Sequence, residues 1–460
     1  MDTRIVFDPA LIRKYDKAGP RYTSYPTAVQ FHEGFAVAEY RELALASNAA
    51  GKPLSLYVHI PFCDTVCFYC ACNKIVTKNR RHTVPYLDHL HREIALQGAL
   101  FDRSRPVAQL HWGGGTPTFI SAAEMRELMR VTGEQFRLLD DDSGEYSIEV
   151  DPRETDDHTI ALLRELGFNR LSLGVQDFDP EVQKAVNRVQ SRAITLQVMD
   201  AARREGFKSI SVDLIYGLPL QSVASFGRTV EDIVAQGPDR ISAFNYAHLP
   251  DLFKTQRQID PAALPPPAVK LAILETTIRR LTDAGYVYIG MDHFAKPDDE
   301  LALAQQAGTL YRNFQGYSTH ADCDLIGLGA TAIGMVGEGY SQNLKGLEDY
   351  FARIDEGRLA VFRGVRLDAD DRLRRAVITD LICHFALDFA AVERRHGIRF
   401  RDYFAPELAE LADMEADGLL ALSDTGIEVL PPGRLLIRNI CMAFDRYLRE
   451  QKQQRFSKVI

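Results

Sequence analysis

The sequence predicts an α/β fold in which a partial or full TIM-type (β/α) barrel extends from about residue 50 to residue 360. Two observations predict it. Short runs rich in β-branched and aromatic residues alternate with helical segments, a pattern typical of a parallel sheet. Cysteines, glycines and carboxylates follow the ends of these runs, and the carboxyl ends of parallel barrel strands are where such folds build their sites. We therefore expect these residues to converge in space.

Six runs are predicted as barrel strands, and a seventh is a candidate. Helical segments separate them, and several of these segments end in glycine, a common stop signal. In chain order the runs are SLYVHI (55–60), AQLHW (108–112), YSIEV (146–150), RLSLGV (170–175), SISVDLI (209–215) and RISAFNY (240–246), and the candidate is YVYIGM (286–291).

Two further segments flank the predicted barrel domain, which we place at residues 37–364. Residues 1–36 contain PRYTSYPTA, whose prolines favour an extended arm over a helix. That arm either covers the barrel mouth or packs on the surface as a strap. We expect residues 365–460 to form a mostly helical C-terminal domain of winged-helix-like type, with a hairpin at LLALSDTGIEVL.

Composition narrows the function classes. The chain of 460 residues is 46% hydrophobic and 25% charged, with a formal net charge of −9. We expect no nucleic-acid partner from that acidic balance, and no membrane span because no apolar run is long enough. The first residues lack a signal-peptide pattern, so we expect a soluble cytoplasmic protein in which disulfides are disfavoured.

The stretch HIPFCDTVCFYCACNK (59–74) places four of the seven cysteines on one short loop. Three interpretations compete. A structural zinc site would use four thiolates, and a redox pair would use only Cys67 and Cys70. An iron–sulfur cluster would use Cys63, Cys67 and Cys70, whose CxxxCxxC spacing can hold three irons and leave the fourth open for another ligand.

These motifs resemble the radical S-adenosylmethionine superfamily, in which CxxxCxxC is followed by a glycine-rich strand end such as HWGGGTPT (111–118). Within it, the chain is similar to the oxygen-independent coproporphyrinogen III oxidases of haem biosynthesis along nearly its whole length. The strings that carry this resemblance include PRYTSYPTA, SLYVHIPFC, CACNKIVT, SIEVDPRE, FNRLSLGVQDF, VNR, DLIYGLP, FNYAHLP, GMDHFAKPDDELA, RNFQGY and GRLLIRNICM.

The resemblance implies one 4Fe–4S cluster on Cys63, Cys67 and Cys70, and two molecules of S-adenosylmethionine. It also implies catalytic roles for Cys72 and Tyr69. The first cofactor site would take Tyr57, Gly114, Glu149 and Ile333, and the second Tyr69, Gly115, Thr116, Gln176, Arg188, Asp213 and Ala247.

The implied reaction is an anaerobic oxidative decarboxylation. A 5′-deoxyadenosyl radical takes hydrogen from two propionates of coproporphyrinogen III in turn, and each becomes a vinyl group, which gives protoporphyrinogen IX. A one-electron reductant such as flavodoxin or ferredoxin is implied as partner, and nothing in the sequence demands an oligomer, so we expect a monomer. The alternative is a haem-binding chaperone of a related branch, which lacks the fourth cysteine and much of the arm.

Two features keep two interpretations each. The basic run Lys74, Lys78, Arg80, Arg81 and His82 is either a solvated face or a binding surface for the substrate's carboxylates, for which Arg21 is a second candidate. We expect Cys72 to be a free thiol beside the cluster that donates hydrogen or shapes the pocket, and the alternative is a buried packing residue.

Overall fold

The computed structural model describes residues 5–450, and the chain divides into two compact units. Unit 2 comprises residues 31–273 and 322–366, and unit 1 comprises residues 1–30, 274–321 and 367–460. Among the described residues no helix is both long enough and apolar enough to cross a bilayer.

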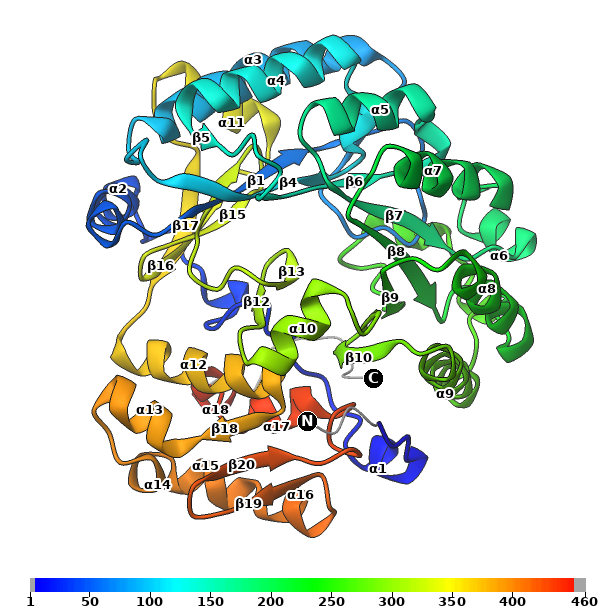
Figure 1. Cartoon of the computed structure of the whole chain (residues 1–460), viewed down its shortest axis with the longest axis vertical. Coiled ribbons are helices and arrows are strands. Elements are labelled where there is room, and N and C mark those ends of the chain that lie inside the picture. Colours follow the sequence, from blue (N-terminus) through cyan, green and yellow to red (C-terminus); the bar gives the residue numbers. More distant parts are fainter. Residues whose placement is uncertain (1–4, 451–460) are drawn as a thin grey trace. The chain divides into compact units, whose positions relative to one another are not determined.

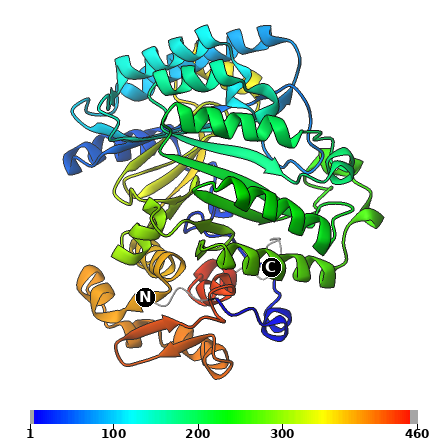
Figure 2. The same ribbon diagram turned by 45° about the vertical axis from the view of Figure 1, so that its right-hand side comes forward.

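Unit 2 is built on one curved sheet, which Figures 1 and 2 show from two sides. Strands β1 to β9 of this sheet and β14 are parallel, and β14 to β17 continue it in antiparallel fashion. In spatial order the strands are β9 (Arg240–Asn245), β8 (Ser209–Tyr216), β7 (Arg170–Gln176), β6 (Glu145–Val150), β4 (Pro106–Gly114), β1 (Leu54–Ile60), β14 (Asp324–Leu328), β15 (Ile333–Val336), β16 (Gly339–Asn343) and β17 (Val361–Arg366).

Helices connect successive parallel strands and cover the outer face of the sheet (Figure 1). The predicted partial (β/α) barrel is thus confirmed, with six βα strands where six were expected. The helices are α2 (Val37–Ser47), α3 (Thr83–Gly98), α4 (Ala122–Gln135), α5 (Asp157–Glu165), α6 (Pro180–Ala185), α7 (Arg192–Arg204), α8 (Val223–Gln236), α9 (Pro267–Asp283) and α11 (Leu347–Asp355). The short strand β5 (Arg137–Leu138) extends β4.

The sequence of each strand explains how it is buried. In β8 the apolar residues Ile210, Val212 and Leu214 are fully buried against the helices, while the residues between them are only half-buried. Such alternation follows from the two-residue repeat of a strand, and it sends every second side chain to the inner face of the barrel. On the outer side, Trp112 of β4 is fully buried and meets Phe168 edge-to-face, with ring centroids 4.9 Å apart.

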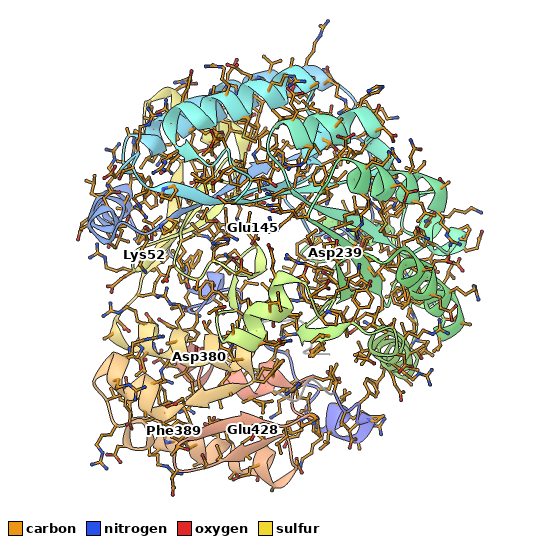
Figure 3. All side chains as sticks on the ribbon, in the orientation of Figure 1. Lys52, Glu145, Asp239, Asp380, Phe389 and Glu428 are labelled. Carbon is orange, nitrogen blue, oxygen red and sulfur yellow. The ribbon has the colours of Figure 1, made fainter. Side chains whose placement is uncertain are left out.

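The side chains drawn in Figure 3 mark the amino-terminal edge of this sheet. Lys52 precedes β1, Glu145 begins β6 and Asp239 precedes β9. Because all six barrel strands run in the same direction, their carboxyl ends lie together at the opposite edge, where the sequence places its unusual residues.

The seventh candidate is confirmed as a strand. Residues 287–290 form β10 (Val287–Gly290), which belongs to unit 1 and pairs antiparallel with β11 (His293–Ala295). The reason is the tight connection after β10, where Met291 has φ +55° and turns the chain straight back. A return so short allows only an antiparallel neighbour.

Unit 1 joins the beginning and the end of the chain. The predicted hairpin is confirmed as β19 (Leu420–Leu422) paired with β20 (Gly426–Val429). A third strand, β18 (Ala386–Asp388), pairs with the other side of β20. The remaining elements are α1 (Pro9–Lys14), α10 (Glu300–Ala307), β12 (Tyr311–Asn313), β13 (Gly316–Ser318), α12 (Ala369–His384), α13 (Phe389–His396), α14 (Phe400–Tyr403), α15 (Ala405–Glu410), α16 (Ala412–Ala416), α17 (Ile437–Met442) and α18 (Arg446–Glu450).

The arm is bound to the C-terminal segment within unit 1. Residues 20–27 are free of helix, as the prolines predict. The Tyr22 hydroxyl donates a hydrogen bond to Asp445 Oδ2 at 2.9 Å, and the Tyr25 hydroxyl accepts one from the amide of Arg446 at 3.1 Å. Both tyrosines are buried. The division at residues 36 and 364, and the placement of the arm over the barrel mouth, stay predictions.

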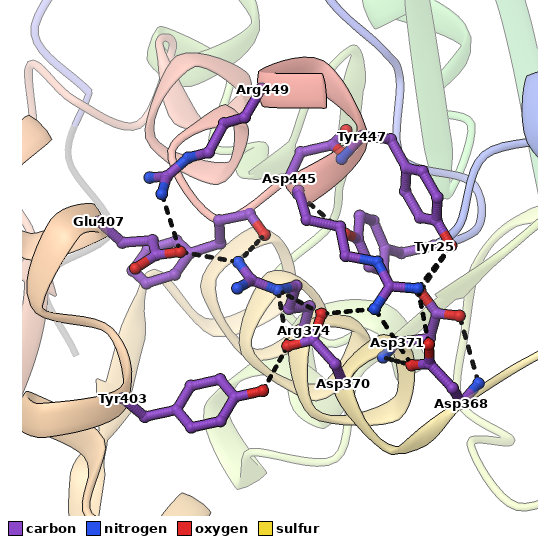
Figure 4. A network of polar contacts seen from close by, with 12 residues as sticks. Tyr25, Asp368, Asp370, Asp371, Arg374, Tyr403, Glu407, Asp445, Tyr447 and Arg449 are labelled. Carbon is purple, nitrogen blue, oxygen red and sulfur yellow. Dashed lines mark hydrogen bonds and ion pairs between the residues drawn. The ribbon is translucent and has the colours of Figure 1, made fainter. Parts of the chain in front are cut away.

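An ion-pair network surrounds this contact (Figure 4). Arg446 forms ion pairs with Asp368 and Asp370, each at 2.8 Å. Arg374 pairs with Asp370 at 2.8 Å and with the buried Glu407 at 2.9 Å. Two guanidinium groups therefore share Asp370 and are each surrounded by carboxylates.

Candidate active site at the carboxyl ends of the parallel strands

The inner face of the barrel carries a row of polar side chains that strand register places side by side. Tyr57 of β1 is opposite His111 of β4, and their rings stack 5.8 Å apart. Glu149 of β6 is opposite Ser172 of β7, whose hydroxyl donates to Asp213 of β8 at 3.1 Å. Residues that are 156 positions apart in sequence thus form one continuous polar surface.

The cysteine loop is fixed above this surface at both of its ends. Strand β2 (Phe62–Cys63) pairs with β3 (Ile75–Val76), and the amide of Ile75 donates to the carbonyl of Pro61 at 2.7 Å. Between them, the amide of Phe68 donates to the carbonyl of Val186 at 3.0 Å, which ties the middle of the loop to the end of α6. The loop is therefore held from two directions.

Two of the three cysteines with cluster spacing accept hydrogen bonds from side chains of neighbouring loops. Thr116 donates to Cys63 Sγ at 3.7 Å. Arg188 and Arg153 donate to Cys67 Sγ at 3.5 and 3.7 Å. Such donors stabilise a thiolate, which is the form that binds iron. The environment of these sulfurs is thus suited to a negatively charged ligand set.

The third of these cysteines has a different environment. A hydrogen bond from the Cys72 thiol lowers the pKa of Cys70, and Lys74 acts in the same direction. Lys74 also donates to the carbonyl of Cys70 at 3.0 Å. Burial, by contrast, raises the pKa of the Cys63 thiol to about 11. Cys72 itself is exposed rather than buried.

These thiols fit an iron–sulfur cluster by the chemistry of their donor set. Soft thiolates select iron–sulfur clusters, and a coordinating thiol loses its proton outright, which offsets the cost that burial imposes on Cys63. Within residues 5–450 no three His, Cys, Asp or Glu side chains are arranged around a single metal ion.

Two glycines at the end of β4 stand where the Cβ of any other residue would collide with neighbouring atoms. A Cβ on Gly115 would lie 2.6 Å from the carbonyl oxygen of Phe62, and one on Gly113 would lie 2.9 Å from Glu149 Oε1. Gly114 between them has φ +115°, a conformation that L side chains rarely adopt. The GGGTPT segment is thus built for close backbone approach beside the cysteine loop.

Glu149 lies at the centre of the expected first cofactor site. Its carboxylate accepts a hydrogen bond from the amide of Gly114 at 3.1 Å and lies 3.4 Å from His111 Nε2. Desolvation raises its pKa, but His111 and Gly114 outweigh that effect and lower it below the usual value. The side chain is 46% exposed. Glu149 is therefore an ionised, accessible carboxylate that can receive an ammonium group.

The other two residues of the expected first site are linked through Gly327. Tyr57 is opposite Gly327 in the pairing of β1 with β14. A Cβ on Gly327 would lie 2.8 Å from the carbonyl carbon of Ile333. Tyr57 and Ile333 thus lie on β1 and β15, the two strands on either side of β14, and the Tyr57 hydroxyl is 3.0 Å from His59 Nδ1.

The expected second site contains a strained residue with an unpaired polar atom. Gln176 ends β7 with φ +69°, and its buried Oε1 has no hydrogen-bond partner within the described part of the chain. Backbone strain of this kind costs about 1–3 kcal/mol and recurs at functional sites. Neighbouring Asp213 is half-buried, and desolvation raises its pKa to about 6.

Arg188 connects this second site to the cysteine loop. Its guanidinium forms a 3.0 Å ion pair with Asp151 and donates to the carbonyl of Gly174 at 2.5 Å, in addition to its bond to Cys67. Although burial raises the pKa of Asp151, Arg188 and Arg153 hold it below its usual value. In the sequence, only the short motif VNR indicates Arg188 as a site residue. The structure places this arginine beside the thiols.

The remaining members of the expected second site come from separate loops. Tyr69 packs against an apolar cluster that includes Val186 and Tyr246, and its carbonyl accepts a hydrogen bond from Gln256 at 3.0 Å. Ala247 directly follows Tyr246, whose amide donates to the carbonyl of Tyr216 at 2.9 Å. All of these lie in unit 2.

Sequence reasoning missed two polar residues of the site, Arg153 and His111. Arg153 stands in the quoted string SIEVDPRE, and it pairs with Asp151 at 2.7 Å while donating to Cys67.

In the basic run, Arg80 forms an ion pair with Glu154 at 3.2 Å and lies over the ring of Phe119. That arginine already has a structural partner.

Comparison with known proteins defines the class first. The Radical SAM superfamily profile matches residues 57–233, and the HemN C-terminal domain profile matches residues 367–436. With the strand-end thiol loop and glycine segment, the match makes this a radical S-adenosylmethionine protein, so it uses a 4Fe–4S cluster and S-adenosylmethionine.

Relatives then define the family. The chain is 56% identical over 460 residues to the oxygen-independent coproporphyrinogen III oxidase of Pseudomonas aeruginosa, with all of both chains covered. It is 51% identical to that of Escherichia coli, with 99% of each covered. The crystal structure of coproporphyrinogen III oxidase (HemN) from Escherichia coli matches with TM-score 0.92 at 50% identity, covering 97% of this chain and 100% of that one. The chain belongs to the oxygen-independent coproporphyrinogen III oxidase family.

Proposed function

We propose that this protein converts coproporphyrinogen III to protoporphyrinogen IX without oxygen, by oxidative decarboxylation of two propionate side chains. The observation that carries the proposal is the cysteine loop. Cys63 accepts a hydrogen bond from Thr116, after β4, and Cys67 accepts one from Arg153, after β6, directly beside the glycines of GGGTPT. When bound, the cluster and S-adenosylmethionine supply the 5′-deoxyadenosyl radical that takes hydrogen from a propionate.

Cys63, Cys67 and Cys70 would hold the cluster. In the first cofactor site, Glu149 would receive the ammonium group of the methionine moiety, since its carboxylate is ionised and accessible. The backbone of Gly114 would lie against the cofactor, and Tyr57 would line the site with Ile333.

We assign a second S-adenosylmethionine to the residues around Gln176. The unpaired Oε1 of Gln176 would accept a hydrogen bond from this ligand, and the half-buried Asp213 lies nearby. The second group of residues comprises Tyr69, Gly115, Thr116, Gln176, Arg188, Asp213 and Ala247.

Cys72 and Tyr69 are proposed as the residues nearest the chemistry. Cys72 is an exposed residue whose thiol hydrogen-bonds Cys70, so it lies beside the cluster ligands without being needed as one. There it would donate a hydrogen atom or a proton. Burial raises the pKa of Tyr69, which keeps its hydroxyl protonated and able to donate a hydrogen bond.

The partners follow from the reaction. Cluster reduction requires a one-electron donor, for which flavodoxin or ferredoxin is suitable. The substrate carries four carboxylates and the chain has a net charge of −9, so cationic side chains must meet the substrate locally. We propose that the protein works in the cytoplasm as a monomer.

One experiment tests the proposal. Protein reconstituted with iron and sulfide is incubated anaerobically with dithionite, S-adenosylmethionine and coproporphyrinogen III, and products are separated by chromatography. Protoporphyrinogen IX and two equivalents of carbon dioxide are expected. Stoichiometric haem binding without turnover would replace the proposal with the chaperone alternative.

A further inference from the structure

Four of the sequence motifs contribute no residue to the site in unit 2, yet they meet in unit 1. PRYTSYPTA supplies Arg21, GMDHFAKPDDELA supplies Asp292, RNFQGY supplies Arg312 and GRLLIRNICM supplies Arg438. Burial, followed by the charge of Arg21, lowers the pKa of Arg438 to about 10, and Arg312 acts in the same direction. Arg438 therefore lies close enough to Arg21 and to Arg312 to be repelled by each of them.

Arg312 is the unusual member of this group. It begins no helix and ends no loop, but lies in the middle of β12, and its side chain is 93% buried because only 7% of the residue is exposed. Its Nε and Nη1 have no hydrogen-bond acceptor within residues 5–450. The guanidinium lies over the ring of Tyr317, 4.7 Å from the centroid.

The other two arginines near Arg312 already have partners within unit 1. Arg21 forms a 2.8 Å ion pair with Asp292. Arg438, only 4% exposed, donates to the carbonyls of Pro20, at 3.0 Å, and Gly19. These bonds position Arg438.

A buried guanidinium is costly unless it is paired, and buried charges in proteins are nearly always paired or hydrogen-bonded. A cation–π contact with Tyr317 offsets only part of that cost, because such contacts are worth about 0.5–2 kcal/mol. The remaining donors of Arg312 point to an anion. A planar fork of N–H groups matches the two oxygens of a carboxylate.

The backbone around this fork is held in place. Gly290 has φ +144°, and a Cβ there would lie 2.3 Å from the Tyr317 hydroxyl. The turn at Met291, with φ +55°, directs Asp292 toward Arg21. Only a glycine at position 290 therefore lets Tyr317 take the position on which Arg312 rests.

We propose that Arg312, with Arg438 and Arg21 around it, forms a carboxylate-binding site in unit 1. Arg312 makes the bidentate contact, and the other two supply positive charge. The carboxylate comes from a propionate side chain of the tetrapyrrole or from a free small organic acid. The first of these sources rests on the proposed function, whereas the carboxylate chemistry does not.

The first test separates a ligand-binding arginine from a structural one by stability. Arg312→Met removes the charge and keeps the apolar stem. In ligand-free holoprotein its melting temperature is expected to equal or exceed that of the wild type, because an unpaired buried charge has been removed. Arg399→Met, which removes an exposed arginine of unit 1 paired with Asp402, is the control. A fall in melting temperature confined to Arg312→Met would assign Arg312 a structural role and overturn the proposal.

The second test measures binding. Coproporphyrin III, the stable oxidised form of the porphyrinogen, and its tetramethyl ester are titrated by fluorescence into anaerobic holoenzyme. Arg312→Met is expected to weaken the free acid at least tenfold and to leave the ester unchanged, and Arg312→Lys, which keeps the charge but loses the fork, should be intermediate. Unchanged porphyrin affinity, together with a melting-temperature increase from millimolar propionate that needs Arg312, would identify a free acid as the ligand.

The outcomes also separate this inference from the proposed function. If neither porphyrin affinity nor the propionate effect depends on Arg312, the site is refuted even when the wild type forms protoporphyrinogen IX. If both depend on Arg312 and the wild type forms no product, the carboxylate site stands and the proposed function fails.

Discussion

The ion-pair network of unit 1 and the strand-end site of unit 2 are both rich in arginine and carboxylate, but they use them differently. In the network, Arg446 and Arg374 are each surrounded by aspartates or glutamates (Figure 4). In the site, Arg188 divides its hydrogen bonds between Asp151, a backbone carbonyl and a cysteine sulfur.

Backbone geometry differs in the same way. The site contains Gln176 with a positive φ and an unpaired Oε1, and glycines with no space for a Cβ. The network instead begins with Asp368 at the start of α12, where its carboxylate caps the amide of Asp371 at 2.7 Å. In the network, polar groups are paired and helix ends are capped, so they stabilise the fold. In the site, a strained backbone and an unpaired polar atom indicate that a ligand binds there.

The largest effect should come from the cluster ligands. Changing Cys63, Cys67 or Cys70 to serine is expected to abolish both bound iron and turnover, because a three-thiolate site has no spare ligand. Iron and sulfide analysis of anaerobically purified protein checks this. Cys323→Ala, at a buried cysteine elsewhere in unit 2, is the control and should keep four irons. A serine variant with four irons and normal turnover would contradict the ligand assignment.

Cys72→Ser should lower catalytic turnover without loss of the cluster. We expect iron, sulfide and the cluster spectrum to be retained while conversion of coproporphyrinogen III falls at least a hundredfold, since a serine hydroxyl is a far poorer hydrogen-atom donor than a thiol. Loss of iron in this variant would make Cys72 a ligand. Full turnover would reduce it to a packing role.

Breaking the network should affect stability and leave the site intact. Arg374→Met leaves Glu407, which is buried, with one ion pair fewer, and removing one partner of a buried pair costs about 3–5 kcal/mol. A lower melting temperature with normal iron content is expected. Arg358→Met, which removes an exposed pair with Glu356, should change stability by less than about 1 kcal/mol. Loss of iron in Arg374→Met would show that the two regions are not independent.

A smaller, pH-dependent effect is expected from Glu93. This residue of α3 is fully buried and accepts hydrogen bonds from the amide of Gly329, the side-chain amide of Asn343 and the hydroxyl of Tyr350, at 2.6–2.7 Å. Burial nevertheless raises its pKa to about 7. The folded state therefore holds a proton that the unfolded state has released between pH 4.5 and pH 7.

Stability conferred by this proton is present below about pH 4.5 and is lost as pH rises through 7, by up to about 3 kcal/mol. Denaturant unfolding of the wild type and of Glu93→Gln between pH 5 and pH 8 measures it. The wild type should lose stability relative to the variant as pH rises. Parallel pH profiles would show that Glu93 does not titrate in that range.

Several parts of the fold and site could be predicted from the sequence because they depend on local patterns. Six strands followed from alternating runs, and their parallel direction brought GGGTPT, Glu149 and Asp213 to the same edge. The ion pair of Asp151 with Arg188 could not be predicted, since it depends on how the loop after β6 meets the end of α6. Likewise, the pairing of residues 287–290 with β11 depends on the positive φ at Met291, which the sequence does not reveal.

Unit 1 also has a consequence for synthesis of the protein. It combines residues of the first 30 positions with residues after 367, and Tyr22 and Tyr25 are bound by Asp445 and Arg446. On the ribosome, the barrel strands emerge and can pair while those partners of the two tyrosines are still untranslated. The amino-terminal arm therefore leaves the exit tunnel more than 400 residues before its binding surface exists, and throughout that interval its aromatic side chains are available to chaperones.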